Sequence, residues 1–180
     1  DGVSISEPYS AITSVTIGDC VKTIDNSAFG GMTNLERVQS YGANVETIGS
    51  YAFSGCTSLE DIYIGCNTKT IGTGAFQDCE SVSALNICAG VETIGTRSFV
   101  NLTGYSGNVD IPASVTSIGS SAFSNCSSLT KTNYTGDIAG WCDIKFGNSS
   151  ANPIYYSHNF YINDVEIKDL VIPNSVDSIH

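Results

Sequence analysis

Cysteine and histidine are the residues of this 180-residue chain that most readily support metal binding or nucleophilic chemistry, and their spacing argues against both. The seven cysteines form no Cys-x-x-Cys pair, and no histidine lies near any of them, so a structural zinc site is not indicated. His158 and His180 belong to no Ser-His-Asp or His-Glu-x-x-His pattern, and no phosphate-binding glycine loop is present. We therefore expect no catalytic site, no cofactor and no bound metal.

The pattern that dominates the chain is a repeat, Thr-Ile-x-x-x-Ala-Phe. It or a close variant occupies residues 23–29, 47–53, 70–76, 93–99 and 117–123. Its isoleucines follow one another at steps of 24, 23, 23 and 24 residues, and a phenylalanine comes five residues after each. A fixed period with apolar residues in the same columns means that stacked units share one continuous core. The sequence predicts a solenoid with the phenylalanines as its buried spine.

Each unit also contains a short segment in which polar and apolar residues alternate. In Leu-Glu-Asp-Ile-Tyr-Ile (59–64), Ile62 and Ile64 face one side and Asp61 and Tyr63 the other, as in a half-buried strand. Strands one period apart must run parallel. We expect five or six such strands, whose centres are Thr16, Tyr63, Asn86, Asp110 and Val171.

The cysteine column belongs to this core. Cys56, Cys79 and Cys126 share a position that is filled in other units by Met32 and Leu102, so the column is hydrophobic. Equivalent residues on adjacent strands are about 4.7–4.9 Å apart, which is wider than the Cβ separation of a disulfide. We expect Cys56 and Cys79 to be free thiols, as most of the seven cysteines should be.

Charge excludes several partners. The net charge is −11, with only seven Lys and Arg residues, so the chain lacks the basic footprint of a nucleic-acid binder. No apolar run approaches the length of a membrane span. One charged column alternates in sign from unit to unit, which suits an exposed ladder that avoids like-charge neighbours. Its members are Lys22, Glu46, Lys69 and Glu92.

The repeat units resemble a known family. Segments such as 112–129 (PASVTSIGSSAFSNCSSL) and 172–179 (IPNSVDSI) are similar to the BspA-like, or Treponema-pallidum-type, leucine-rich repeats, and the similarity covers roughly residues 12–180. The resemblance implies a right-handed, β-rich superhelix with a parallel concave sheet and short helical turns or irregular segments on the convex side. It also implies an extracellular or cell-surface location and adhesion to a host or neighbouring-cell macromolecule.

We interpret residues 1–180 as a single leucine-rich repeat domain. Residues 1–11 are an N-terminal flank, 12–129 regular repeats of about 23 residues, 130–168 an insert in a variant repeat, and 169–180 a resumed and apparently incomplete repeat. Within the insert we expect a short helix or turn over 136–146, a hairpin at Asn163–Asp164, and a resumed concave strand at 168–173.

The leading functional hypothesis is a surface or secreted interaction module that binds through its concave face. The alternatives are a structural spacer within a larger surface protein and an enzyme whose site lies in the insert. We expect an extracellular protein or glycan as partner, no nucleic acid, no membrane insertion of this segment, and a monomer. The insert either forms one wall of a groove or packs its aromatic residues into a small core. The candidate ligand-binding residues are Arg37, Gln39, Asp61, Tyr63, Asn86, Asn108, Asp110, Lys131, Asn133, Asp169 and Trp141.

Overall fold

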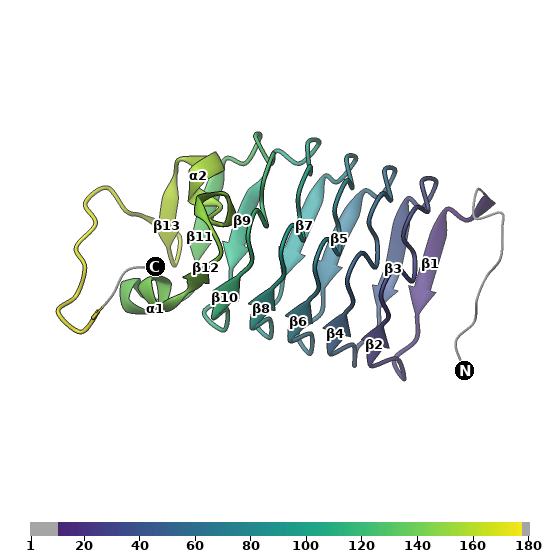
Figure 1. Ribbon diagram of the computed structural model, residues 1–180, viewed down its shortest axis with the longest axis horizontal. Helices are drawn as coiled ribbons and strands as arrows, with labels where there is room; N and C mark the ends of the chain where they lie inside the picture. The colour runs from purple at the N-terminus through teal and green to yellow at the C-terminus, as the bar shows by residue number, and fades with distance from the viewer. Residues whose placement is uncertain (1–10, 178–180) are drawn as a thin grey trace.

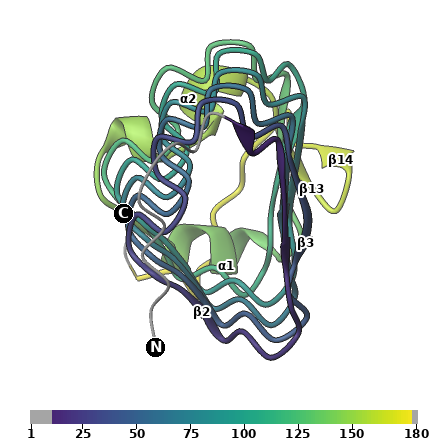
Figure 2. The same ribbon diagram turned by 90° about the vertical axis from the view of Figure 1, so that its right-hand side faces the viewer.

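The computed structural model describes residues 11–177 and shows a stack of rungs along one axis (Figure 1). Each regular rung contributes a long strand and a short strand on different sides of the stack (Figure 2). The long strands are β1 (Ser14–Ile17), β3 (Arg37–Tyr41), β5 (Asp61–Ile64), β7 (Ala84–Ile87), β9 (Asn108–Ile111) and β11 (Lys131–Tyr134). The short strands are β2 (Thr23–Ile24), β4 (Thr47–Ile48), β6 (Thr70–Ile71), β8 (Thr93–Ile94), β10 (Ser117–Ile118) and β12 (Lys145–Phe146).

Strands from successive rungs pair in parallel on both sides of the stack. The predicted leucine-rich repeat solenoid is therefore confirmed. Thr16, Tyr63, Asn86 and Asp110 lie in β1, β5, β7 and β9, as expected from the alternation. Part of the predicted N-terminal flank, residues 1–10, and the terminal His180 lie outside the described residues.

The core is the stacked interior that the columns predict. Consecutive spine rings stack with centroids between 5.0 and 5.7 Å apart, and all but the first are fully buried. The spine consists of Phe29, Phe53, Phe76, Phe99 and Phe123. The amide of each of the first four donates to a carbonyl of the next rung, at 2.7–2.9 Å. The side of the stack without strands is thus also tied together by backbone hydrogen bonds.

The short strands form a second parallel sheet that the sequence did not predict, in the order β12-β10-β8-β6-β4-β2. Each short strand except β2, which Asp25 follows, is followed by a glycine that the close approach of the neighbouring rung requires. A Cβ at Gly72 would lie 2.6 Å from the carbonyl carbon of Gly49 and from the amide nitrogen of Ser50. Two residues after this glycine the backbone is left-handed, as at Tyr51 (φ 58°) and Arg97 (φ 55°).

Buried thiols explain the cysteine column. The Sγ atoms of Cys56, Cys79 and Cys126 donate to the spine carbonyl oxygens of the preceding rung at 3.0–3.2 Å. Burial raises the pKa of Cys56 and of Cys126 to about 12, so these thiols stay protonated at neutral pH. The prediction that Cys56 and Cys79 are free is confirmed.

One disulfide joins adjacent rungs and was not predicted. It links Cys66 to Cys88, whose Cα atoms are 4.8 Å apart, at the corners that follow β5 and β7. The column argument missed it because the two cysteines are not equivalent. Cys66 comes two residues after Ile64, whereas Cys88 comes one residue after Ile87, and this offset brings the two side chains together.

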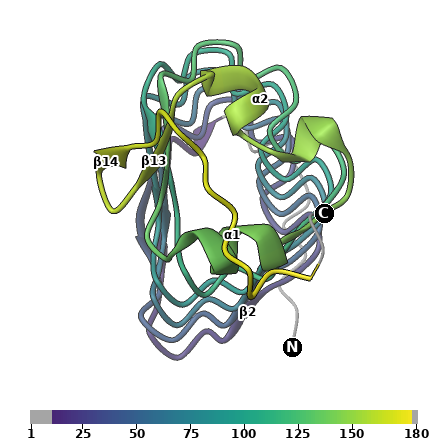
Figure 3. The ribbon, with the colours of Figure 1, turned by 90° about the vertical axis from the view of Figure 1, so that its left-hand side faces the viewer.

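The segment after β11 forms a variant rung. The helix α1 (Ile138–Asp143) precedes β12, which pairs with β10 so that Phe146 lies opposite Ile118. The short helices η2 (Ser149–Ala151) and α2 (Ile154–Ser157) then lead to β13 (Phe160–Ile162), which pairs in parallel with β11. Figure 3 shows α1 and α2 at the C-terminal end of the stack. The short helix predicted within 136–146 is confirmed.

A hairpin closes this end. β14 (Val165–Glu166) pairs antiparallel with β13, and Asn163 (φ 47°) and Asp164 (φ 64°) form the predicted turn. The strand predicted within 168–173 is wrong. This segment has no assigned strand and runs beyond the last rung, with Leu170 56 % and Val171 77 % exposed (Figure 1). Nothing in the part of the chain that the structure describes is a helix long and apolar enough to cross a membrane.

Candidate binding site

Five of the predicted ligand-binding residues lie together on the exposed side of the long strands, which we call the long-strand face. They come from β3, β5 and β7 and line a shallow hollow of about 620 Å³, the Tyr63 groove. These residues are Arg37, Gln39, Asp61, Tyr63 and Asn86. The alternation of each strand points them outward, so repeat geometry alone brings them to one surface.

The groove lies where the long-strand sheet is interrupted. β1 pairs with β3 and β5 pairs with β7, but β3 and β5 belong to separate ladders. Val38 lies opposite Val15, whereas Ser40 lies opposite Thr16, so Gln39 is an extra residue in β3. Such a bulge bends a strand and disrupts its pairing. It also accounts for the 24-residue step from Ile24 to Ile48.

Apolar residues form the floor of the groove and one aromatic ring stands at its rim. Val38 and Leu85 are half-buried, and Ala84 leaves room because its side chain is small. Tyr63 is 63 % exposed. An adjoining hollow of about 300 Å³ is also lined by Val38, Gln39 and Tyr63, so Tyr63 borders both hollows.

Hydrogen bonds connect the polar residues at the rim of the groove to residues of neighbouring rungs. The Nη2 and Nε atoms of Arg37 donate to Oε2 of Glu60 at 3.1 and 3.3 Å. Oγ1 of Thr16 donates to Oε1 of Gln39 at 3.2 Å. The groove therefore combines an apolar floor with a guanidinium, a carboxylate, two amides and an exposed tyrosine. This set can bind a ligand by ring contact and hydrogen bonding, and tyrosine and arginine dominate many protein interfaces.

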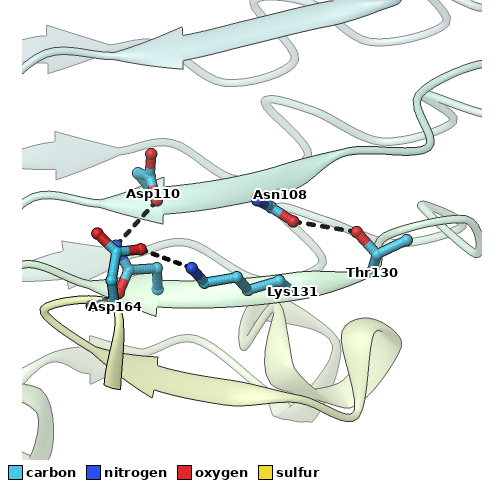
Figure 4. A network of polar contacts seen from close by, with 6 residues as sticks. Asn108, Asp110, Thr130, Lys131 and Asp164 are labelled. Carbon is cyan, nitrogen blue, oxygen red and sulfur yellow. Dashed lines mark hydrogen bonds and ion pairs between the residues drawn. The ribbon is translucent and has the colours of Figure 1, made fainter. Parts of the chain in front are cut away.

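The other end of the long-strand face is closed by the hairpin (Figure 4). The Nδ2 of Asn133 donates to Oδ1 of Asp110 at 3.0 Å, and Oδ1 of Asn133 accepts from the backbone amide of Asp164 at 2.9 Å. Asn133 is consequently only 4 % exposed. Oγ1 of Thr130 donates to Oδ1 of Asn108 at 3.1 Å. Asn108 and Asp110 remain exposed, but both accept hydrogen bonds within the chain.

Lys131 is held by the same hairpin. Its Nζ lies 2.6 Å from Oδ1 of Asp164 and 4.4 Å from the ring centroid of Tyr161. The hydrogen bond that the Lys131 ammonium donates to Asp164 raises the pKa of Lys131 above its ordinary value. Lys131 and Asn133 thus bind the hairpin, and we place them outside the Tyr63 groove.

Two predicted site residues lie away from the long-strand face. Trp141 is 8 % exposed and packs against Tyr134, Phe146 and Phe160, so the alternative of a small aromatic core describes its position. Asp169 lies beyond β14 and not in a strand beside Lys131, because the expected strand does not form.

Sequence reasoning did not identify several residues that shape the two ends. Val38 and Glu60 contribute to the groove and its rim, and Tyr161 and Asp164 contribute to the closed end. The extra residue in the second repeat was a usable signal for the bulge, since insertions in a regular array must be accommodated locally. A further hollow of about 480 Å³ is lined by Ser127 of the last regular repeat and by Tyr155, Tyr156 and His158 of the insert.

The column of alternating charge forms ion pairs on neighbouring rungs, directly before the short strands and not on the long-strand face. Lys22 lies 3.7 Å from Glu46, and Lys69 lies 3.1 Å from Glu92. All four side chains are more than half exposed, which confirms the prediction of an exposed column. Exposed pairs of this kind contribute about 0.2–1 kcal/mol each.

A solenoid of parallel strands with an exposed long-strand face is the architecture of leucine-rich repeat proteins. The family model described as BspA type leucine rich repeat region, in six copies, matches residues 8–130. The chain belongs to this family, whose repeats are typical of bacterial surface proteins that take part in protein interactions. A search of curated proteins finds no match.

Several solved structures are similar to this one, among them the following two. A leucine-rich repeat protein of T. pallidum is 28 % identical over 67 % of this chain and 58 % of its own, with a TM-score of 0.63. The pneumococcal vaccine antigen PcpA is 26 % identical over 68 % of this chain and 30 % of its own, with a TM-score of 0.59. The matched region thus spans less than two thirds of the length of either protein.

Proposed function

We propose that the chain is the protein-interaction module of a cell-surface or secreted protein and that it binds an extracellular protein through the Tyr63 groove. The observation that carries the proposal is the convergence of Tyr63, Arg37 and Asp61 around an apolar floor on the long-strand face. Repeat solenoids present extended surfaces of this kind to their partners. Interfaces concentrate binding energy in such aromatic and arginine anchors.

The disulfide supports an extracellular location. Disulfides persist in oxidising compartments and are rare in the cytosol, where thiols are kept reduced. Cys66 and Cys88 brace the two rungs that carry Tyr63 and Asn86, which lie opposite each other in β5 and β7. A bond that requires oxidation therefore fixes the part of the sheet that forms the groove. The similarity to a protein named as a vaccine antigen also fits this location.

A binding screen tests the proposal. The purified chain is passed over immobilised extracellular-matrix proteins and over a glycan array, and each binder is measured again with the Tyr63→Ala and Arg37→Ala variants. Truncating an anchor at the centre of an interface weakens binding by about 2 kcal/mol or more, roughly thirtyfold. We expect this loss for Tyr63→Ala toward a protein partner.

Tyr161→Ala is the matched control, because Tyr161 is also a tyrosine on the long-strand face but lies in the register of the closed end. It should leave binding unchanged. Binding that survives Tyr63→Ala would contradict the proposed site, and binding to glycans alone would contradict a protein partner. A screen without any binder would favour the structural spacer.

A further inference from the structure

The closed end of the long-strand face shows how this sheet binds a cation. Lys131 extends from the start of β11 toward Tyr161 on β13, and its Nζ lies 4.4 Å from the centroid of the ring. The same Nζ donates to Oδ1 of Asp164 at 2.6 Å (Figure 4). The face of a tyrosine ring and a carboxylate both attract a positive charge, so the two groups act together on one ammonium.

The Tyr63 groove contains the ring and the carboxylate of a similar site without the cation. Asp61 and Tyr63 are the first and third residues of β5, so their side chains project on the same side of the strand. Both line the groove, and Tyr63 is 63 % exposed. Within residues 11–177 the carboxylate of Asp61 forms no hydrogen bond or ion pair, and no cation lies over the ring of Tyr63.

Neither of the rungs beside β5 supplies that cation. Arg37, the first residue of β3, directs its guanidinium to Glu60, with Nη2 3.1 Å from Oε2. Ala84 lies opposite Asp61 as the first residue of β7, the position that a lysine takes in β11. Because the side chain of Ala84 ends at Cβ, the space beside the Asp61 carboxylate belongs to the hollow of about 620 Å³. The groove therefore has room for a cation from another molecule.

The charges of the groove and of the whole chain favour a basic partner. Arg37 and Glu60 compensate each other, which leaves the negative charge of Asp61 uncompensated. The net charge of −11 gives the chain a field that attracts cations and repels anions. The apolar floor at Val38 and Leu85 suits the methylene groups of a lysine or arginine side chain, which pack on apolar surfaces while the charged end stays polar.

We propose that the Tyr63 groove binds a basic segment of its protein partner and that one lysine or arginine side chain of this segment lies between Asp61 and the ring of Tyr63. The inference rests on the proposed function of the groove and adds the chemistry of the partner. The incoming cation makes the two contacts that Lys131 makes within the chain: it lies over a tyrosine ring and donates to an aspartate. Its methylene groups cover the apolar floor.

NMR titration of the isotope-labelled 180-residue chain with short peptides tests the proposal. The probe is a capped pentapeptide with one lysine between alanines, and its matched controls carry arginine, norleucine or glutamate instead. The lysine and arginine peptides should shift the amide signals of Asp61, Tyr63 and Ala84 to saturation. The norleucine peptide keeps the methylene groups without the charge and should bind at least about fivefold more weakly, and the glutamate peptide should not bind. Added salt should weaken binding of the lysine peptide.

Variants of the groove test the position of the cation. Asp61→Asn and Tyr63→Leu should each weaken binding of the lysine peptide by about threefold to tenfold. Glu80→Gln is the matched control, because it changes the net charge equally at an exposed residue outside the groove. It should change the affinity by less than about twofold. Ala84→Lys supplies an ammonium from the chain itself and should abolish binding. The dispersion of the NMR spectrum shows whether each variant is folded.

Several results would overturn the cation site. They are a lysine peptide without saturable shifts, equal binding of the lysine and norleucine peptides, equal losses for Asp61→Asn and Glu80→Gln, and binding that survives Ala84→Lys. The proposed function fails on a different result, which is a protein partner whose affinity is unchanged by Tyr63→Ala. A partner that is lost with Tyr63→Ala but keeps its affinity for Asp61→Asn would retain the groove and overturn the basic contact.

Discussion

The two ends of the long-strand face are built from the same repeat and differ in what covers them. Near β5, Tyr63 and its neighbours surround a hollow that no other segment within residues 11–177 fills. Near β11, the hairpin lies against the equivalent surface, and Asn133 and Lys131 bind it. Outward polar residues are thus available to a partner at one end and used for folding at the other. Position within the array, and not residue type, separates the two roles.

Replacing an aromatic residue by alanine should give the largest difference in stability between the two ends of the long-strand face. Trp141→Ala removes the centre of the small aromatic core and should lower the free energy of unfolding by about 3–5 kcal/mol. Tyr63→Ala removes an exposed ring and should change it by less than about 0.5 kcal/mol. Urea denaturation of both variants provides the measurement. A comparable loss for both would mean that Tyr63 is a structural residue.

The disulfide should stabilise the part of the long-strand sheet that forms the Tyr63 groove. Replacing Cys66 and Cys88 together by serine should lower the free energy of unfolding by about 2–4 kcal/mol, because the unfolded chain gains freedom. The same loss should appear when the wild type is unfolded in the presence of a reductant. Reductant should have no effect on the serine variant, and a further loss there would point to a different bond.

Asparagine in the same outward column of two rungs, in β7 and in β11, offers a closer comparison. Asn133→Ala leaves Asp110 and the Asp164 amide without their partner and should cost about 1–3 kcal/mol. Asn86→Ala lies on the exposed rim of the Tyr63 groove and should change stability by less than about 0.5 kcal/mol. Thermal and urea unfolding of the pair would measure the difference. Equal losses of stability would contradict the distinction between outward residues that hold the hairpin and outward residues that are free to bind a partner.

The smallest expected effect is the pH dependence of the Lys131–Asp164 contact. Asp164→Asn should cost about 0.2–1 kcal/mol near neutral pH. The pKa of Lys131 is raised in the folded state, so the contribution is fully present below the ordinary lysine pKa. It is lost as pH rises through the higher folded value. Wild type and variant should converge in stability at high pH, and a constant difference would indicate an uncharged role for Asp164.

The repeat columns allowed most of the fold to be predicted, because each apolar column reports burial independently of its neighbours. Ile62 and Phe76 face the core for the reason read from their period. The second sheet was missed because a strand of two residues is too short for alternation to be visible. The Cys66–Cys88 bond was missed because the comparison was made within columns and the two cysteines lie in different ones.

The candidate site was predictable in part. Strand alternation identified the outward residues, so Tyr63, Asp61 and Asn86 could be named. It could not show that the hairpin would cover Asn133, since that contact joins residues from separate rungs. Nor could it show that Leu170 would lie off the sheet, because its local pattern is that of a strand and the competing occupant is β14. The local sequence pattern predicts which side of a strand a residue faces. Contacts with other segments decide whether that residue is exposed.

Radical footprinting of the complex with a bound protein is the most direct test of the Tyr63 groove. Tyr63 and Tyr155 are similarly exposed, at 63 % and 58 %. Tyr63 lies on the long-strand face, whereas Tyr155 lies on the insert. The account predicts that Tyr63 becomes strongly protected from oxidation on binding while Tyr155 keeps its reactivity. Protection of Tyr155 with unchanged Tyr63 would contradict it and would place the binding surface on the insert.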